Sequence, residues 1–190
     1  PVLAEVALLG LTLHAIWITH GHIDHAGGAA EMAEKAGVPI IGPHTADDYW
    51  IADLAEHGLR YGLPDARTFT PDRWLADGDI LTLGETRWSV LHCPGHTPGH
   101  VVFFNAAARF AQVGDVLFAG SIGRTDFPGG DHETLIRSVV EKLWPLGDDV
   151  TFVPGHGPVS TLGQERRDNP FVSDRALAAS PRPPVRSGPG

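Results

Sequence analysis

The chain has 190 residues, 42% hydrophobic and 19% charged, which is enough to bury the core of one globular domain. Its formal net charge is −9 and it has no basic block, which argues against nucleic acid as the main partner. Cys93 is the only cysteine, which excludes an intrachain disulfide and a CxxC zinc knuckle and fits a reducing, cytoplasmic environment. No apolar run reaches the roughly 18 residues of a membrane span, and residues 1–13 lack signal-peptide features, so we expect no membrane partner.

The first half of the chain is predicted to alternate helices with short strands. Helices are expected at residues 1–10, 28–36 and 45–56, and strands at 15–18 and 38–41. Gly37 and Gly58 follow two of these helices and are natural stops, because glycine readily takes the left-handed conformation of a helix C-cap. Thr45 can N-cap the third helix with its hydroxyl.

The second half is predicted to contain a run of strands followed by helices. Strands are expected at residues 80–83, 87–91, 101–104, 108–113 and 150–153, with a hairpin turn at 84–86. Asp131 can N-cap a helix in which Leu135, Val139 and Leu143 lie four residues apart and form one buried face. Thr161 begins a capping-box pattern for a short last helix. This order of elements predicts helices packed outside sheets in one α/β domain.

The last residues of the chain differ in composition from the rest. From residue 173 onward, Ala, Pro, Arg, Ser and Gly dominate. Such a composition cannot bury enough apolar surface to offset the entropy of ordering, so we expect residues 173–190 to be a disordered Pro/Arg-rich tail. The folded domain is therefore expected to span residues 1–172.

The densest cluster of metal-binding side chains directly follows the strand expected at residues 15–18. Residues 20–25 have the pattern H-x-H-x-D-H, and imidazole and carboxylate are ligands that Zn²⁺ and Fe²⁺ prefer. Open α/β folds usually place their sites at the carboxyl ends of strands, which is where this cluster falls. Taken alone, the cluster is compatible with a metal site or with a polar turn.

Three later predicted strands also end in a glycine next to a residue that can bind metal. His96, Asp115 and His156 follow the strands expected at 87–91, 108–113 and 150–153. Glycine lets the backbone turn tightly and direct a neighbouring side chain inward. Any one of these histidines could be an ordinary surface or core residue. Four strand ends that carry such residues together predict one shared metal site.

These motifs resemble those of the metallo-β-lactamase-fold hydrolases, and most closely the single-domain glyoxalase II-like (hydroxyacylglutathione hydrolase-like) proteins. The segments at 91–100, 123–128 and 153–158 carry the closer similarity, and the resemblance covers roughly residues 10–172. It implies a four-layer αββα sandwich, with residues 1–172 as the catalytic domain. The family usually begins with further strands, so we expect an N-terminally truncated domain in which one sheet lacks its first strands.

The resemblance also implies seven ligands for two metal ions, in two groups joined by one bridging carboxylate. The first group consists of His20, His22 and His96. The second group consists of Asp24, His25 and His156, and Asp115 is the bridge. Zn²⁺ is expected at both positions, and Fe or Mn is compatible with the same nitrogen and oxygen ligands. Two metals about 3.5 Å apart can share a water and lower its pKa toward neutrality. Asp24 and Asp115 are expected to be catalytic as well, because they would orient that hydroxide.

The reaction that the resemblance implies is metal-assisted hydrolysis of a thioester. A metal-bridging hydroxide would attack the acyl carbonyl, and the first metal would stabilise the oxyanion. The expected partner is therefore a small-molecule thioester, an S-(2-hydroxyacyl)glutathione, acted on by a monomer or small homo-oligomer. Glyoxalase II proper has an added helical domain that contacts glutathione, and here the tail from residue 173 takes its place.

Two alternatives to a thioester hydrolase remain open from the sequence. The first is a mononuclear iron dioxygenase that acts on glutathione persulfide, since such enzymes share the fold and much of the ligand set. The second is a truncated metal-binding fragment without activity, which the expected lack of the first strands would explain. Lactonase, β-lactamase and nuclease activities occur in the wider superfamily and rank lower.

Overall fold

The computed structural model describes residues 2–179 of the chain. The helices are α1 (Val2–Leu8), α2 (Ile23–Ala26), α3 (Ala29–Ala36), α4 (Asp48–Ala52), α5 (Leu54–Tyr61), α6 (His132–Ser138), α7 (Leu162–Asp168) and α8 (Asp174–Ala179). Short turns of other helical types precede α4 and extend α6, namely η1 (Thr45–Asp47), η2 (Val139–Leu143) and η3 (Trp144–Leu146). The strands are β1 (Ile16–Trp17), β2 (Ile40–Ile41), β3 (Ile80–Leu83), β4 (Thr86–His92), β5 (Val101–Asn105), β6 (Phe110–Gly114), β7 (Leu117–Phe118), β8 (Ser121–Ile122), β9 (Thr151–Pro154) and β10 (Ser160–Thr161).

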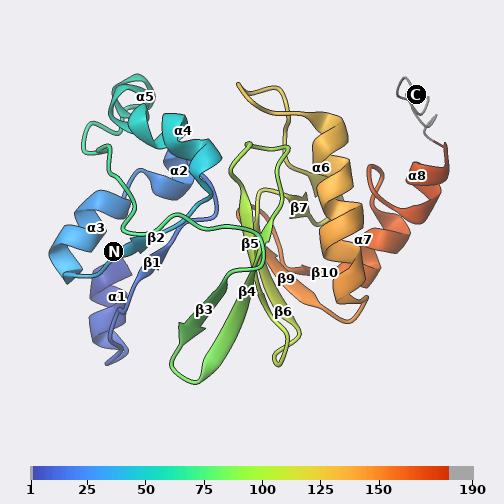
Figure 1. Cartoon of the computed structure of the whole chain (residues 1–190), viewed down its shortest axis with the longest axis horizontal. Coiled ribbons are helices and arrows are strands. Elements are labelled where there is room, and N and C mark those ends of the chain that lie inside the picture. The colour runs from blue at the N-terminus through green and yellow to red at the C-terminus, as the bar shows by residue number, and fades with distance from the viewer. Residues whose placement is uncertain (1, 180–190) are drawn as a thin grey trace, which may run out of the picture.

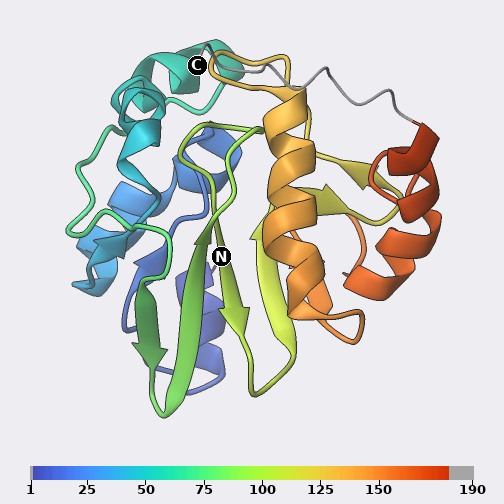
Figure 2. The same ribbon diagram turned by 45° about the vertical axis from the view of Figure 1, so that its right-hand side comes forward.

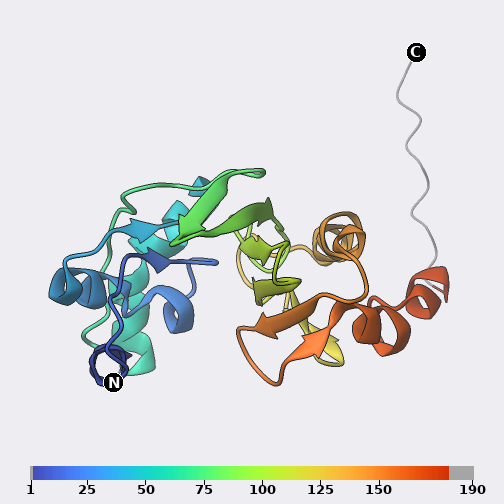
Figure 3. The same ribbon diagram turned by 90° about the horizontal axis from the view of Figure 1, so that it is seen from below.

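These elements form four layers in the order helix, sheet, sheet, helix (Figures 1 and 3). Helices α1, α3, α4 and α5 cover the small parallel sheet formed by β1 and β2. The larger sheet has six strands in the order β10-β9-β6-β5-β4-β3 and carries α6 and α7 on its other side, as Figure 2 also shows. The αββα sandwich expected from the sequence is therefore confirmed. No helix within residues 2–179 is both long and apolar enough to cross a membrane.

Three hydrophobic clusters hold the four layers together, one at each interface between layers. Leu135 of α6 and Phe152 of β9 belong to the cluster between the large sheet and its helices. Ile40 of β2 and Leu54 of α5 belong to the cluster on the other helical side. The middle cluster joins the two sheets and includes Phe103, whose ring lies 5.3 Å from that of Trp17. The loops of the site are thus anchored in rigid strands on both sides.

Most predicted elements agree with the structure, but the helix expected at residues 45–56 is divided into η1, α4 and α5. The expected Thr45 cap is wrong, because His44 caps this stretch and its Nδ1 accepts a hydrogen bond from the backbone N–H of Ala46 at 3.1 Å. The Asp131 cap is confirmed, because its Oδ1 accepts a hydrogen bond from the backbone N–H of Thr134 at 2.7 Å. The last of the three segments that replace the helix expected at residues 45–56, α5, runs past the expected stop at Gly58 to Tyr61 and ends at Gly62, which is left-handed. Gly58 serves close packing, since a Cβ there would lie 2.5 Å from the carbonyl oxygen of Leu63.

The expected disordered tail from residue 173 is wrong for residues 174–179, which form α8. The sequence of α8 is rich in alanine and contains neither glycine nor proline, so its intrinsic helix propensity is high. Asp174 also accepts a hydrogen bond from Arg166 of α7, which attaches α8 to the domain. Residues 180–190, the rest of the expected tail, lie outside the described residues.

Candidate metal centre

Four segments bring the candidate side chains together, and each leaves the carboxyl end of a strand. His20 and His22 lie in the loop after β1, and the one-turn helix α2 carries Asp24 and His25. The remaining three candidates follow β4, β6 and β9 and are His96, Asp115 and His156. The structure thus collects all seven residues predicted from the sequence at one edge of the two sheets.

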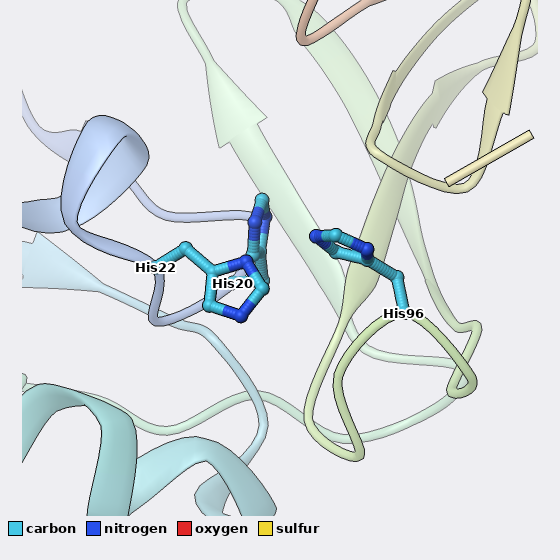
Figure 4. Close-up of side chains that lie close together, drawn as sticks. All are labelled: His20, His22 and His96. Atoms are coloured by element: carbon cyan, nitrogen blue, oxygen red, sulfur yellow. The ribbon is translucent and has the colours of Figure 1, made fainter. Parts of the chain in front are cut away.

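The ligand atoms of these residues fall into overlapping groups, within each of which all atoms lie inside 4.8 Å of one another. The groups are His20, His22 and His96; His20, His25 and Asp115; and Asp24, His25 and His156. In Figure 4, the imidazoles of the first group point toward a common space from two different loops. The first and last groups have the membership expected for two neighbouring metal ions.

Asp115 lies between the two groups of ligands. Its Oδ1 is 3.4 Å from Nε2 of His25, and its Oδ2 is 3.5 Å from Nε2 of His96. One carboxylate therefore contacts a member of each group with a different oxygen atom, which is the arrangement that a bridging ligand needs.

The second group is more open to solvent than the first. Asp24 Oδ2 lies 3.0 Å from Nε2 of His156, and the side chains are 52% and 57% exposed. His20 and His96, in contrast, are almost completely buried. The first group therefore forms the floor of the site, and the second faces the opening.

Several buried polar atoms at the centre have no hydrogen-bond partner within residues 2–179. They are Asp115 Oδ1 and the Nε2 atoms of His20, His22 and His96. Leaving a buried polar atom unpaired costs about 1–3 kcal/mol. Because these four atoms lie close together, a single bound cation could satisfy several of them. His96 Nδ1 donates to the carbonyl oxygen of Arg124 at 2.7 Å, which leaves the lone pair of its Nε2 free for a cation. The donor set fits divalent metal ions that accept nitrogen and oxygen ligands.

The protonation states also suit metal binding. Burial lowers the pKa of His22 to about 3 and holds the pKa of His20 well below its usual value, so both imidazoles are neutral near pH 7. Burial alone would raise the pKa of Asp115, but its close approach to His25 and the other neighbouring imidazoles lowers it below its usual range. The first ligand group therefore presents neutral nitrogen donors beside an ionised carboxylate.

A cleft of ≈ 980 Å³ opens directly onto the centre. Its lining includes His22, Asp115 and His156, and much of its wall is aromatic. The aromatic wall residues come from α4, α5, β7 and the loop after β8, and are Tyr49, Trp50, Tyr61, Phe118 and Phe127. The cleft thus combines a polar floor with walls that can enclose an organic substrate.

The rim of the cleft is held by polar contacts. Arg124 and Asp126 form an ion pair, with Nε and one terminal nitrogen of Arg124 each 2.7 Å from a carboxylate oxygen. The same guanidinium lies 4.0 Å from the ring centre of Phe127. Tyr49 donates its hydroxyl hydrogen to the carbonyl oxygen of Pro128 at 2.7 Å, which ties α4 to this loop.

Two further residues of the metal loops have structural roles. Cys93 is fully buried, and burial raises the pKa of its thiol. His100 stacks on His20 with ring centres 4.7 Å apart, and its Nε2 accepts a hydrogen bond from the backbone N–H of Asp115 at 3.0 Å. His100 therefore supports the candidate ligands His20 and Asp115, and it is not itself one of the seven candidates.

Sequence reasoning missed the wall residues on α4 and α5, including Tyr49 and Trp50, and also the buried carboxylate of Asp47. They lie in a stretch whose sequence predicted a helix and gave no sign of a functional site. Only the folded arrangement brings them against loops that are distant in sequence.

Comparison with known proteins identifies the family. A family model described as the metallo-beta-lactamase superfamily matches residues 2–156. Hydroxyacylglutathione hydrolase GloC of Haemophilus influenzae is 45% identical over 176 residues, which cover 92% of this chain and 83% of that protein. Among solved structures, BLEG-1 B3 metallo-beta-lactamase has a TM-score of 0.82 at 37% identity, covering 90% of this chain and 82% of that one. TTHA1623 in a di-iron-bound form has a TM-score of 0.80 at 38% identity, with coverages of 90% and 83%. The chain therefore belongs to the metallo-beta-lactamase superfamily and is a metallo-hydrolase of that fold.

Proposed function

We propose that the protein hydrolyses the thioester of an S-(2-hydroxyacyl)glutathione at two metal ions held by the seven side chains of the centre. The observation that carries this proposal is the pair of adjacent ligand groups joined by Asp115 at the floor of an aromatic cleft. A relative with 45% identity bears the name hydroxyacylglutathione hydrolase, which supports the choice of thioester.

Bound metal ions would supply Lewis acidity, which activates a water molecule and polarises the acyl carbonyl. His20, His22 and His96 hold neutral nitrogen donors on the buried side, so they leave the charge of a cation largely uncompensated there. Asp24 is the exposed carboxylate of the centre and can accept a hydrogen bond from the attacking water, which fixes its orientation toward the cleft. The leaving thiolate needs no protonation by the protein, because a thiol has a pKa of only about 8.5.

The walls and the rim of the cleft suit a glutathione conjugate. Trp50 and Phe127 provide apolar surface next to His22, with ring centres 4.4 Å and 5.0 Å from the imidazole. Arg60 and Arg124 also line the cleft, each beside its own carboxylate partner, Glu56 and Asp126. Their remaining N–H groups can donate to the carboxylates of a glutathionyl group. The acyl group would lie over the floor, and the peptide part would extend along the rim.

We propose zinc as the resident metal, with iron as the competing candidate. Both ions accept imidazole and carboxylate ligands, which are the donors of this centre. A di-iron-bound form has been solved for a protein that is 38% identical to this chain.

A comparison of substrates tests the proposed reaction. The purified protein, loaded separately with zinc and with iron, should release free thiol from S-lactoylglutathione, measured with a thiol reagent. The same preparations should show little oxygen uptake with glutathione persulfide and little cleavage of a chromogenic β-lactam. Oxygen consumption that depends on persulfide, without release of thiol from the thioester, would replace the proposed reaction with the dioxygenase alternative.

A further inference from the structure

Asp47 is a completely buried carboxylate that belongs to neither ligand group. It ends the short turn η1, directly before α4. Its two oxygens accept hydrogen bonds from the backbone N–H of Gly21 at 2.9 Å, the hydroxyl of Thr97 at 2.7 Å and the backbone N–H of Gly99 at 2.6 Å. None of the ion pairs found in residues 2–179 includes Asp47. Burial raises the pKa of Asp47, and the three hydrogen bonds oppose that effect.

The three donors lie in the two loops that carry the first group of ligands. Gly21 stands between His20 and His22, and Thr97 follows His96 directly. A single oxygen, Oδ2 of Asp47, accepts from both Gly21 and Thr97 and so joins the two loops through one atom. In Figure 4, the imidazoles of these loops face each other from opposite sides of the site.

The backbone of both loops is shaped to admit this carboxylate. A Cβ on Gly99 would lie 2.6 Å from Cγ of Asp47 and 2.5 Å from its backbone nitrogen. A Cβ on Gly21 would lie 2.6 Å from Cβ of Trp50, and Trp50 belongs to α4, which begins directly after Asp47. The same helix packs Trp50 edge-on against His22, with ring centres 4.4 Å apart. Glycine at both positions therefore allows the η1–α4 segment to sit directly against the metal loops.

We propose that Asp47 is a positioning residue that fixes the His20/His22 loop relative to the His96 loop, so that the first ligand group is preorganised for its metal ion. A carboxylate can accept hydrogen bonds from all three donors at once, whereas an amide would turn an N–H toward at least one of them. Loss of this shared acceptor lets the two loops separate without removing any ligand. The proposal rests on metal binding by the first group of the centre.

Metal affinity measured beside stability tests this role. Asp47→Asn should bind Co²⁺ at least ~10-fold more weakly than the wild type, because supporting partners of metal ligands typically contribute this much. It should also shift the d–d absorption bands of the bound Co²⁺, which report ligand geometry. Glu165→Gln is the matched control, since Glu165 is also a buried carboxylate that accepts several hydrogen bonds, but from Gly120, Ser160 and Asn169. That control should lower the melting temperature of the metal-free protein and leave Co²⁺ affinity and spectrum unchanged.

Wild-type affinity and spectrum in Asp47→Asn, with a melting temperature lowered as in the control, would overturn the proposal and leave Asp47 a general structural residue. A wild-type chain that bound no Co²⁺ would refute the metal centre itself, and the role of Asp47 with it. If Asp47→Asn does not fold, Thr97→Val and Thr97→Ser decide the question. Thr97→Val should weaken Co²⁺ binding and Thr97→Ser should restore it, whereas equal affinities in both would contradict the proposal.

Discussion

Replacement of Asp115 by alanine should lower kcat/KM for S-lactoylglutathione by ~100-fold or more and reduce the metal content of the protein. Asp115 contacts both ligand groups, through Oδ1 to His25 and Oδ2 to His96. Loss of a mere supporting partner costs about 10–100-fold in affinity or activity, so loss of a bridging ligand should cost at least the upper value. The measurements are steady-state kinetics and elemental analysis of the purified variant.

Asp65→Ala is the control for Asp115→Ala, because Asp65 is an exposed carboxylate that does not line the cleft. It should retain the activity and metal content of the wild type. Thioester hydrolysis that persisted at the wild-type rate in Asp115→Ala would refute a mechanism that depends on a carboxylate shared by two metals.

A methyl group on Gly155 should disrupt the centre as severely as the loss of a ligand. The added Cβ of Gly155→Ala would lie 2.1 Å from Oδ1 of Asp115 and 2.6 Å from Cε1 of His25. The backbone of Gly155 is not left-handed, so this steric contact alone requires glycine there. Displacement of reacting groups by about 1 Å can cost about 100-fold in rate, and we expect a loss of kcat of that order.

Gly28→Ala provides the matched control for Gly155→Ala. A Cβ on Gly28 would meet no atom within 4 Å, and the φ angle of −93° is open to alanine. Gly28→Ala should therefore keep the kcat and metal content of the wild type, whereas Gly155→Ala should lose activity, as measured by steady-state kinetics and metal analysis. Full activity in Gly155→Ala would mean that Asp115 and His25 do not need the positions they occupy in the structure.

The side chains of the centre were predictable because the signal for each is local. His96, Asp115 and His156 each lie close to a glycine just beyond a strand, and a strand that ends at a sharp turn can be recognised from a few residues. The strand order then brings these ends together without further information. That the residues bind metal ions in two groups stays a prediction, for which their convergence is strong support.

The features that escaped prediction depend on contacts between distant segments. Asp47 lies 26 residues from Gly21 and 50 residues from Thr97, so no local pattern could link it to the metal loops. Gly58 looked like a helix stop, but it is a glycine because Leu63 packs against it. The strands β7 and β8 have two residues each, which is too short for any alternation of apolar and polar residues to be recognised.

Titration of the metal-free protein with Zn²⁺, followed by a competing chromophoric chelator, tests the central claim most directly. The account holds that the two ligand groups bind two metal ions, joined by Asp115. It predicts two equivalents of Zn²⁺ per chain in the wild type, and at most one tightly bound equivalent in His156→Ala, whose group would lose a ligand. A single equivalent in the wild type, or two tight equivalents in both proteins, would contradict it.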